Sequence, residues 1–207
     1  MNIYQKLLSA FRRKVAGTNV RMTYSADGFG VRKKYIPFQN DKQLSQVWQQ
    51  VCSDNDPHWF GETPDIRWRV HVCVWAASNC LRLEGDFAEF GVNTGILSSA
   101  VMKLVDVDSS GKKFFLFDTY EGIPEDMATQ SELKRTQSMN KDLYSGDILG
   151  TAQRVFSAHK SAEIVQGLLP GSICEADFKS LAYVSIDLNS VNAEMSGKNI
   201  DSKGSRI

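Results

Sequence analysis

The stretch Asp86–Ala100 constrains the fold more than any other part of the chain. Residues 87–90 form a short apolar run with two phenylalanines, which is typical of a buried strand. Gly91 and Gly95 follow and bracket a tight turn. After this turn, apolar residues recur at helical spacing: Ile96, Leu97, Ala100, Val101 and Leu104. We therefore expect a strand, a glycine turn and a helix whose N-terminal N–H groups point at a ligand, with glycines that let the ligand approach closely.

Glu89 restricts the ligand that such a turn would receive. A carboxylate at the end of the strand would repel a pyrophosphate, but it would accept a cationic or zwitterionic ligand. A dinucleotide fingerprint also requires G-x-G-x-x-G, which is missing. The pattern E-x-G-x-x-x-G instead resembles motif I of class I S-adenosylmethionine-dependent methyltransferases. Two glycines four residues apart are also common in ordinary strand–helix turns, so that interpretation stays open here.

Composition is that of an ordinary globular protein. The 207 residues suit one domain, and 42% are hydrophobic and 23% charged. Basic and acidic residues both number 24, so no global charge would recruit nucleic acid or a membrane. We find no run of about 20 apolar residues that would span a membrane, and no signal-peptide core. The four cysteines form no C-x-x-C pair, which predicts free thiols in a reducing cytoplasm.

The N-terminal 40 residues are basic, with eight Lys and Arg residues against Asp27 alone, a net charge of +7. This charge favours either an acidic partner or, as we prefer, a solvated arm balanced by acids elsewhere. Five apolar residues fall on one helical face: Ile3, Leu7, Leu8, Phe11 and Val15. A basic amphipathic helix can lie on a membrane, but docking on its own protein or a second subunit is more common.

Residues 16–40, which follow the basic amphipathic helix, are predicted to be loop or short extended pieces. Two further helices are predicted between residue 40 and the glycine turn. Asp41 is expected to cap a helix whose apolar residues recur at i, i+3, i+4 and i+7: Leu44, Val47, Trp48 and Val51. Thr63 followed by Pro64 predicts the start of the next helix, which continues to Leu81. Apolar residues cover much of its circumference, so we expect it to be well buried.

Three more apolar runs predict the remaining strands: 114–117, 162–165 and 182–186. Strands alternating with helices argue for a parallel, doubly wound α/β sheet covered on both faces. Glu89, Asp118 and Asp187 then fall at or near strand C-termini, which share the edge where such sheets bind ligands. Asp118 could accept both hydroxyls of a ribose, or it could cap its own turn. The polar residues 122–146 are predicted to form a mobile or partly helical excursion that could act as a lid.

Three segments occur in order and resemble the macrocin-type O-methyltransferase family: GDFAEFGVNTG at 85–95, FDTYEGIP at 117–124 and IDLN at 186–189. The likeness spans residues 65–195. Members are class I methyltransferases with a Rossmann-like sheet, and many act on sugar hydroxyls. The resemblance therefore implies an S-adenosylmethionine-dependent O-methyltransferase with a sugar-like or other small hydroxylated acceptor.

The resemblance also implies site residues. S-adenosylmethionine would contact the following positions: Glu89, Gly91, Val92, Asn93, Thr94, Gly95, Asp118, Thr119, Gln166 and Gly167. Asp187 matches the family's first metal carboxylate, and it is thereby implied as a catalytic and Mg²⁺-binding residue. The metal would lower the pKa of the acceptor hydroxyl and orient it toward the methyl group. A purely structural role for Asp187 at the end of the sheet is an equal alternative.

The sequence departs from the family after residue 195. The family continues to a strand that ends in Asp-Asp-Tyr, whereas residues 196–207 here are polar and patternless, which predicts a disordered tail. We therefore expect a helical region over 1–64 and an incomplete Rossmann-like domain over 65–195, truncated after its fourth strand. That strand would be an exposed edge open to pairing in a homo-oligomer.

Two other functions remain open from the sequence. One is a truncated, non-catalytic protein that binds the cofactor weakly or pairs with a partner. The other is a nicotinamide-dependent oxidoreductase, against which Glu89 and the missing third glycine argue.

Overall fold

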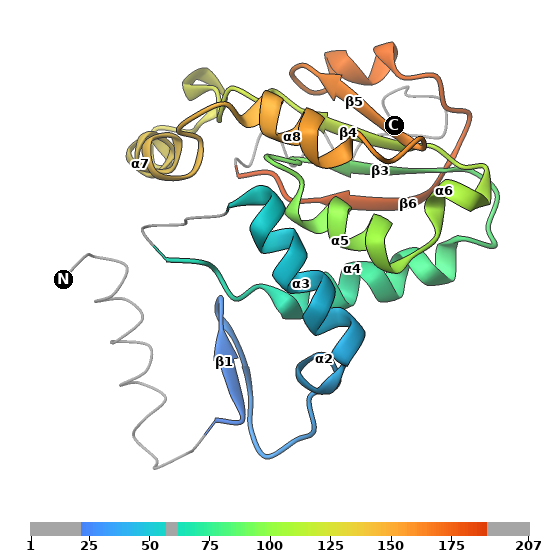
Figure 1. Cartoon of the computed structure of the whole chain (residues 1–207). Coiled ribbons are helices and arrows are strands. Elements are labelled where there is room, and N and C mark those ends of the chain that lie inside the picture. The colour runs from blue at the N-terminus through green and yellow to red at the C-terminus, as the bar shows by residue number, and fades with distance from the viewer. Residues whose placement is uncertain (1–21, 57–61, 190–207) are drawn as a thin grey trace.

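The computed structural model describes residues 22–56 and 62–189. Within them, helices pack around a four-stranded sheet (Figure 1). The N-terminal part contains β1 (Tyr24–Ala26), β2 (Phe29–Val31), α2 (Pro37–Asn40), α3 (Lys42–Asn55) and α4 (Arg67–Cys80). The remainder contains β3 (Asp86–Phe90), α5 (Ile96–Leu104), α6 (Val107–Ser110), β4 (Phe114–Asp118), η1 (Glu125–Met127), α7 (Leu133–Leu143), α8 (Ile148–Phe156), β5 (Ala162–Gln166), η2 (Gly171–Glu175) and β6 (Leu181–Ile186). The predicted helix over 3–15 and the predicted tail lie outside the described residues.

The sheet has the order β5-β4-β3-β6, and every pair of neighbours is parallel. The prediction of four strands in a parallel α/β sheet is therefore confirmed. From β3 the chain crosses to β4 and β5 on one side and then returns to place β6 on the other side of β3. The direction of winding thus reverses between β3 and β6, which is where open α/β sheets form a ligand crevice.

Side chains alternate between the two faces of the sheet, and a different layer covers each face. Helices α4, α5 and α8 pack on the face that carries Phe87 and Phe114. The segment between β5 and β6, which includes η2, packs on the face that carries Phe90 and Phe117. The buried aromatic residues on both faces explain why the strands read as continuous apolar runs. On β6, Val184 and Ile186 stay 45% and 37% exposed, respectively.

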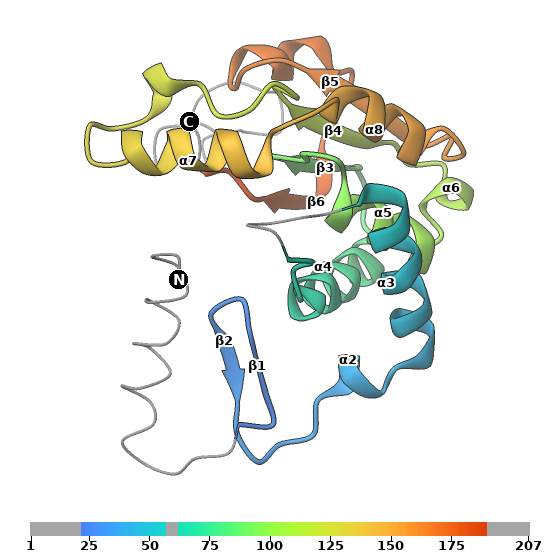
Figure 2. The ribbon, with the colours of Figure 1, turned by 60° about the vertical axis from the view of Figure 1, so that its left-hand side comes forward.

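The N-terminal part begins with a hairpin that the sequence analysis read only as loop or short extended pieces. Its turn residues, Asp27 and Gly28, have φ values of 49° and 73°. Asp-Gly is the typical pair for such a turn and was the overlooked signal. The hairpin lies away from the sheet (Figure 2) and contacts the rest of the chain at α2 and at the start of α4. The helix predicted after Asp41 is confirmed as α3, since the Leu44 N–H donates to the Asp41 carboxylate at 3.0 Å.

Helix α4 differs from its prediction in two ways. It begins at Arg67 and not after Thr63; its N-cap residue is Ile66, which makes no side-chain capping bond, and the Asp65 carboxylate accepts the Arg67 N–H at 3.4 Å. Its outer surface is also exposed, since Val72 and Trp75 are 51% and 65% accessible. A single helix on one face of a sheet buries only the side that it turns to that sheet. Among the helices of residues 22–56 and 62–189, none has the length and apolar content needed to cross a membrane.

Candidate functional site

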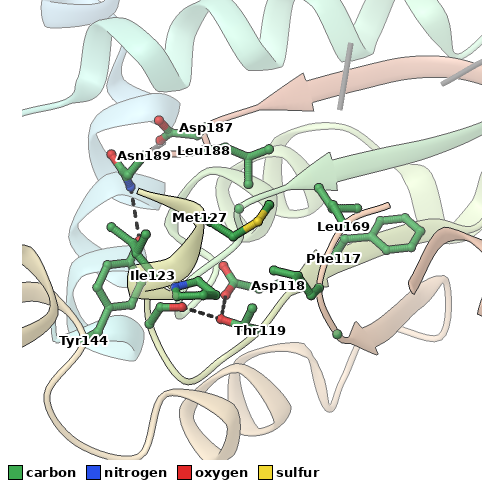
Figure 3. A pocket seen from close by; sticks show the side chains of 15 residues that line it. Phe117, Asp118, Thr119, Ile123, Met127, Tyr144, Leu169, Asp187, Leu188 and Asn189 are labelled. Carbon is green, nitrogen blue, oxygen red and sulfur yellow. Dashed lines mark hydrogen bonds between the residues drawn. The ribbon is translucent and has the colours of Figure 1, made fainter. Parts of the chain in front are cut away.

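One pocket collects residues from the C-terminal ends of all four sheet strands (Figure 3). Gly91 follows β3, Asp118 ends β4, Gly167 follows β5 and Asp187 follows β6. Parallel strands point the same way, so residues far apart in the chain meet at this edge. The pocket thus lies where the winding of the sheet predicts a ligand crevice.

The pocket walls are apolar and come from two connecting segments. Ile123 and Met127 belong to the excursion between β4 and α8, and Leu169 belongs to the connection after β5. The excursion was predicted to be partly helical and to cover a ligand. It contains η1 and α7 and supplies one wall of the pocket. Apolar walls with a few polar groups are typical of small-molecule sites.

Asp118 provides the polar group at the end of β4. Its Oδ2 accepts the Asn93 N–H and its Oδ1 accepts the Tyr120 N–H, each at 2.8 Å. The Tyr120 contact makes Asp118 a turn-capping residue, which was one of the two predicted roles. The Thr119 hydroxyl also donates to Oδ1, at 3.4 Å. An ionised carboxylate has about four acceptor positions, so these three bonds leave about one position for a ligand. Burial raises the pKa of Asp118, and the bonds from the two N–H groups act in the opposite direction.

Glu89 lies behind the pocket and does not line it. Strand alternation places it on the face covered by α5, where it is 2% exposed and the Ser98 hydroxyl donates to its Oε2. Burial raises its pKa to about 8, so the side chain is protonated at neutral pH. The structure places Glu89 outside the pocket lining, and the expectation that its negative charge selects a cationic ligand stays a prediction. The sequence pattern could not reveal the protonation of Glu89, because the charge depends on how deeply the side chain is buried.

The two glycines of the turn are explained by packing within the chain. Gly91 has φ 89° and Gly95 has φ 100°, so both occupy the left-handed region that favours glycine. A Cβ atom at Gly91 would meet the main chain of Asp187, and one at Gly95 would meet the ring of Phe156. The Cβ direction at each of these glycines is thus filled by the protein itself, while Gly91 also lines the pocket.

The predicted cofactor residues divide into two groups. The structure brings five predicted site residues together on the pocket: Gly91, Asp118, Thr119, Gly167 and Asp187. It places the others outside the lining: Glu89, Val92, Asn93, Thr94, Gly95 and Gln166. The Gln166 side chain instead donates to the Thr119 carbonyl at 3.2 Å.

Tyr144 is a pocket residue that the sequence analysis did not identify. Its hydroxyl accepts a hydrogen bond of 3.1 Å from the Asn189 side chain, which joins the end of α7 to the segment after β6. Burial, followed by the charge of Asp118, raises the pKa of Tyr144 to about 12. It therefore presents a neutral hydroxyl to the pocket. Tyr144 lies in a polar segment without periodicity, so no sequence signal marked it.

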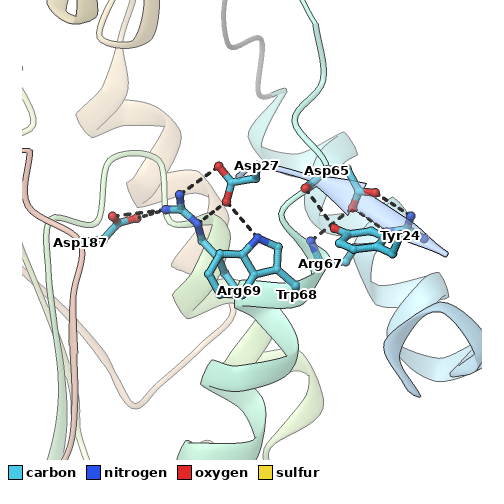
Figure 4. Close-up of polar contacts among 7 residues, drawn as sticks. All are labelled: Tyr24, Asp27, Asp65, Arg67, Trp68, Arg69 and Asp187. Atoms are coloured by element: carbon cyan, nitrogen blue, oxygen red, sulfur yellow. Dashed lines mark hydrogen bonds and ion pairs between the residues drawn. The ribbon is translucent and has the colours of Figure 1, made fainter. Parts of the chain in front are cut away.

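The surroundings of Asp187 do not fit the expected magnesium site. The Arg69 Nη1 atom lies 3.4 Å from the Asp187 carboxylate (Figure 4). A guanidinium at this distance opposes a divalent cation. Within the described part of the chain, no group of three or more His, Cys, Asp or Glu side chains could hold a metal ion.

Comparison with known proteins adds information on the fold. No family model and no curated protein sequence matches the chain. Among solved structures, the O-methyltransferase NovP matches with 15% identity and a TM-score of 0.52, over 70% of this chain and 71% of NovP. CalS11, described as the calicheamicin methyltransferase, matches with 13% identity and a TM-score of 0.49, over 85% and 79% of the two chains. The likeness to NovP shows that the chain has a Rossmann-like fold shared with a methyltransferase.

Proposed function

We propose that the chain is an S-adenosylmethionine-dependent O-methyltransferase that acts on a small hydroxylated acceptor, such as a sugar. The convergence of four strand ends on one pocket with Asp118 at its polar end carries this proposal. The likeness to the O-methyltransferase NovP and the E-x-G-x-x-x-G pattern support it. We place the protein in the cytoplasm, because its four cysteines are free thiols.

The described residues suggest distinct roles at the two sides of the pocket. The remaining acceptor position of Asp118 would receive a ribose hydroxyl, and the apolar wall at Ile123 and Met127 would contact the adenine. When bound, S-adenosylmethionine supplies a methyl group attached to a positively charged sulfur. Asp187 would accept the proton of the acceptor hydroxyl as the oxygen forms its new bond to the methyl carbon and the bond from that carbon to sulfur breaks, which would leave neutral S-adenosylhomocysteine. The neutral Tyr144 hydroxyl would orient the acceptor.

Calorimetric titration with S-adenosylmethionine tests the cofactor site. We expect binding by the wild-type chain and about 10- to 150-fold weaker binding by Asp118→Asn, because a hydrogen bond to a charged acceptor contributes about 1.5–3 kcal/mol. Asp86→Asn is the matched control. Asp86 also accepts a backbone N–H, from Lys113 at 2.9 Å, but it lies at the opposite end of β3. Absence of binding by a folded wild-type chain would contradict the proposal.

A non-catalytic, cofactor-binding protein is the second candidate function. The ion pair between Asp187 and Arg69 favours it, because this carboxylate is engaged within the protein. Formation of S-adenosylhomocysteine should be measured with a panel of sugars and other hydroxylated compounds, with and without magnesium. Product formation that is lost in Asp187→Asn supports the enzyme. Tight cofactor binding without product across the panel supports the second candidate.

A further inference from the structure

Arg69 connects the N-terminal hairpin to the pocket. It lies in the first turn of α4, between carboxylates that are 160 positions apart in the numbering, those of Asp27 and Asp187 (Figure 4). The Arg69 Nε and Nη2 atoms contact the two Asp27 oxygens at 2.6 and 3.0 Å, which is the bidentate geometry of a strong pair. The remaining Nη1 faces the Asp187 oxygens at 3.4 and 3.5 Å. One planar group therefore reaches from the hairpin turn to the pocket rim.

Asp27 is itself held in place. The Trp68 Nε1–H donates to its Oδ2 at 3.0 Å. The ring of Phe29, just beyond the turn, stacks on the Trp68 ring with centroids 5.0 Å apart and an interplanar angle of 18°. Because Asp27 adopts a left-handed φ of 49° in a two-residue turn, its side chain emerges in a direction set by the hairpin. The hairpin thus presents a fixed anchor to Arg69.

The two ends of this connection differ. The Asp27 side chain is 16% exposed and its contacts with Arg69 are short, whereas the Asp187 side chain is 39% exposed and its contacts are long. An ion pair as exposed as the second contributes little to folding stability. Asp27 accordingly fixes the position of the Arg69 guanidinium. The Nη1 group of Arg69 then limits the directions that the Asp187 carboxylate can take. A lysine ammonium is a single point charge and could not span both partners.

We propose that Arg69 is a positioning residue for Asp187 and that the β1–β2 hairpin, acting through Asp27, is part of the acceptor side of the site. The functional consequence rests on the proposed role of Asp187 in receiving the acceptor proton. The chain of contacts from Asp27 through Arg69 to Asp187 is present in the protein without ligands. It can therefore be tested whether or not the cofactor binds.

The test uses the ¹³C NMR signal of the Asp187 carboxyl group in the ligand-free chain, identified by its loss in Asp187→Asn. We expect both Arg69→Lys and Asp27→Asn to shift this signal, although Asp27 does not contact Asp187 in the structure. Arg67→Lys is the matched control. Arg67 lies one position from Trp68 and makes a similar bidentate pair, with Asp65 at 2.8 and 2.9 Å, without contacting Asp187. Its substitution should leave the Asp187 signal in place.

The outcomes separate the parts of the proposal. A shift in Arg69→Lys alone would remove the hairpin from the site, and no shift in either variant would overturn the positioning role. Trp68→Phe keeps an aromatic ring but removes the N–H donor to Asp27. It provides a second variant if Arg69→Lys fails to fold, and it should shift the same signal.

Where methyl transfer is found, Arg69→Lys and Asp27→Asn should both lower turnover. The dissociation constant of S-adenosylmethionine should change less than about twofold, since Asp118 is untouched. A shifted signal without cofactor binding would leave the relay standing and contradict only the proposed function.

Discussion

Two acids at neighbouring strand ends have different environments. Glu89 is enclosed between the sheet and α5, and burial raises its pKa to about 8. Asp118 lines the pocket; burial raises its pKa as well, while the two backbone N–H groups that it accepts act in the opposite direction. The neutral acid thus supports the packing of α5, while the acid with spare acceptor capacity faces the ligand. Chemical identity alone would not have distinguished them.

Glu89 makes the stability of the protein depend on pH. Its folded-state pKa of about 8 lies above the ordinary value of 4.5, so the folded chain holds an extra proton between these limits. The free energy of unfolding should therefore fall as pH rises from 4.5 to 8, by about 1.4 kcal/mol per unit of pKa displacement, and show no further effect of this group above 8. Glu89→Gln should remove this decline in urea unfolding curves.

Glu163→Gln serves as the control for the dependence of unfolding on pH, because the partly exposed Glu163 side chain pairs with Lys113 at the surface. It should retain the wild-type dependence on pH. An unchanged dependence in Glu89→Gln would show that Glu89 is charged in the folded protein.

At the scale of elements, the turn between β3 and α5 is shaped by its neighbours. Gly91 makes room for the chain that leaves β6, and Gly95 makes room for the Phe156 ring of α8. Phe156 is only 4% exposed, so the core holds this ring in place. The turn therefore packs against β6 and α8 at the start of α5. Both glycines allow this packing, and Gly91 also lines the pocket.

Replacing Gly95 by alanine should separate backbone strain from steric conflict. Gly111 also has a positive φ, of 78°, but an added Cβ there would meet nothing within 4 Å. Gly111→Ala should cost about 1–2 kcal/mol from backbone strain alone. Gly95→Ala should lower the free energy of unfolding by at least about 2 kcal/mol more, because a buried ring must shift to accept the methyl group. Equal losses in chemical denaturation would contradict the packing role of Gly95.

At the scale of the whole molecule, the N-terminal helices and the sheet share a core. Val51 of α3 packs in one cluster with Val70 of α4 and Leu97 of α5. The hairpin joins this arrangement through α2 and α4. The pocket, in turn, takes residues from four strands and their connections. A ligand in the pocket would therefore stabilise the whole described unit and not a single segment.

S-adenosylmethionine should raise the melting temperature of the wild-type chain. A ligand present at 100 times its dissociation constant stabilises the folded state by about 2.7 kcal/mol. For a protein of this size, that corresponds to an increase of about 5–10 °C in a single thermal transition. The shift should fall to about half of the wild-type value or less in Asp118→Asn at the same concentration, because its dissociation constant is at least about tenfold higher. Equal shifts in both proteins by calorimetry would show that the cofactor binds elsewhere.

Much of the fold could be predicted because its signals are local. Apolar runs bounded by polar residues marked all four parallel strands, and Asp41 with its following apolar period marked α3. The hairpin was missed although Asp27 and Gly28 are typical turn residues, since its strands are only three residues long. The start of α4 was misplaced because Thr63 does not act as its N-cap; the helix begins after Ile66, which makes no side-chain capping bond.

The sequence by itself determined the order of strands and helices and the edge of the sheet where strand ends meet, because periodicity, glycine and proline act on neighbouring residues. Only the tertiary structure decided that Glu89 is buried and neutral, that Tyr144 enters the pocket and that Asp187 faces Arg69. Each of these properties depends on groups that arrive from distant parts of the chain. Burial and charge pairing are therefore set by packing and not by local sequence.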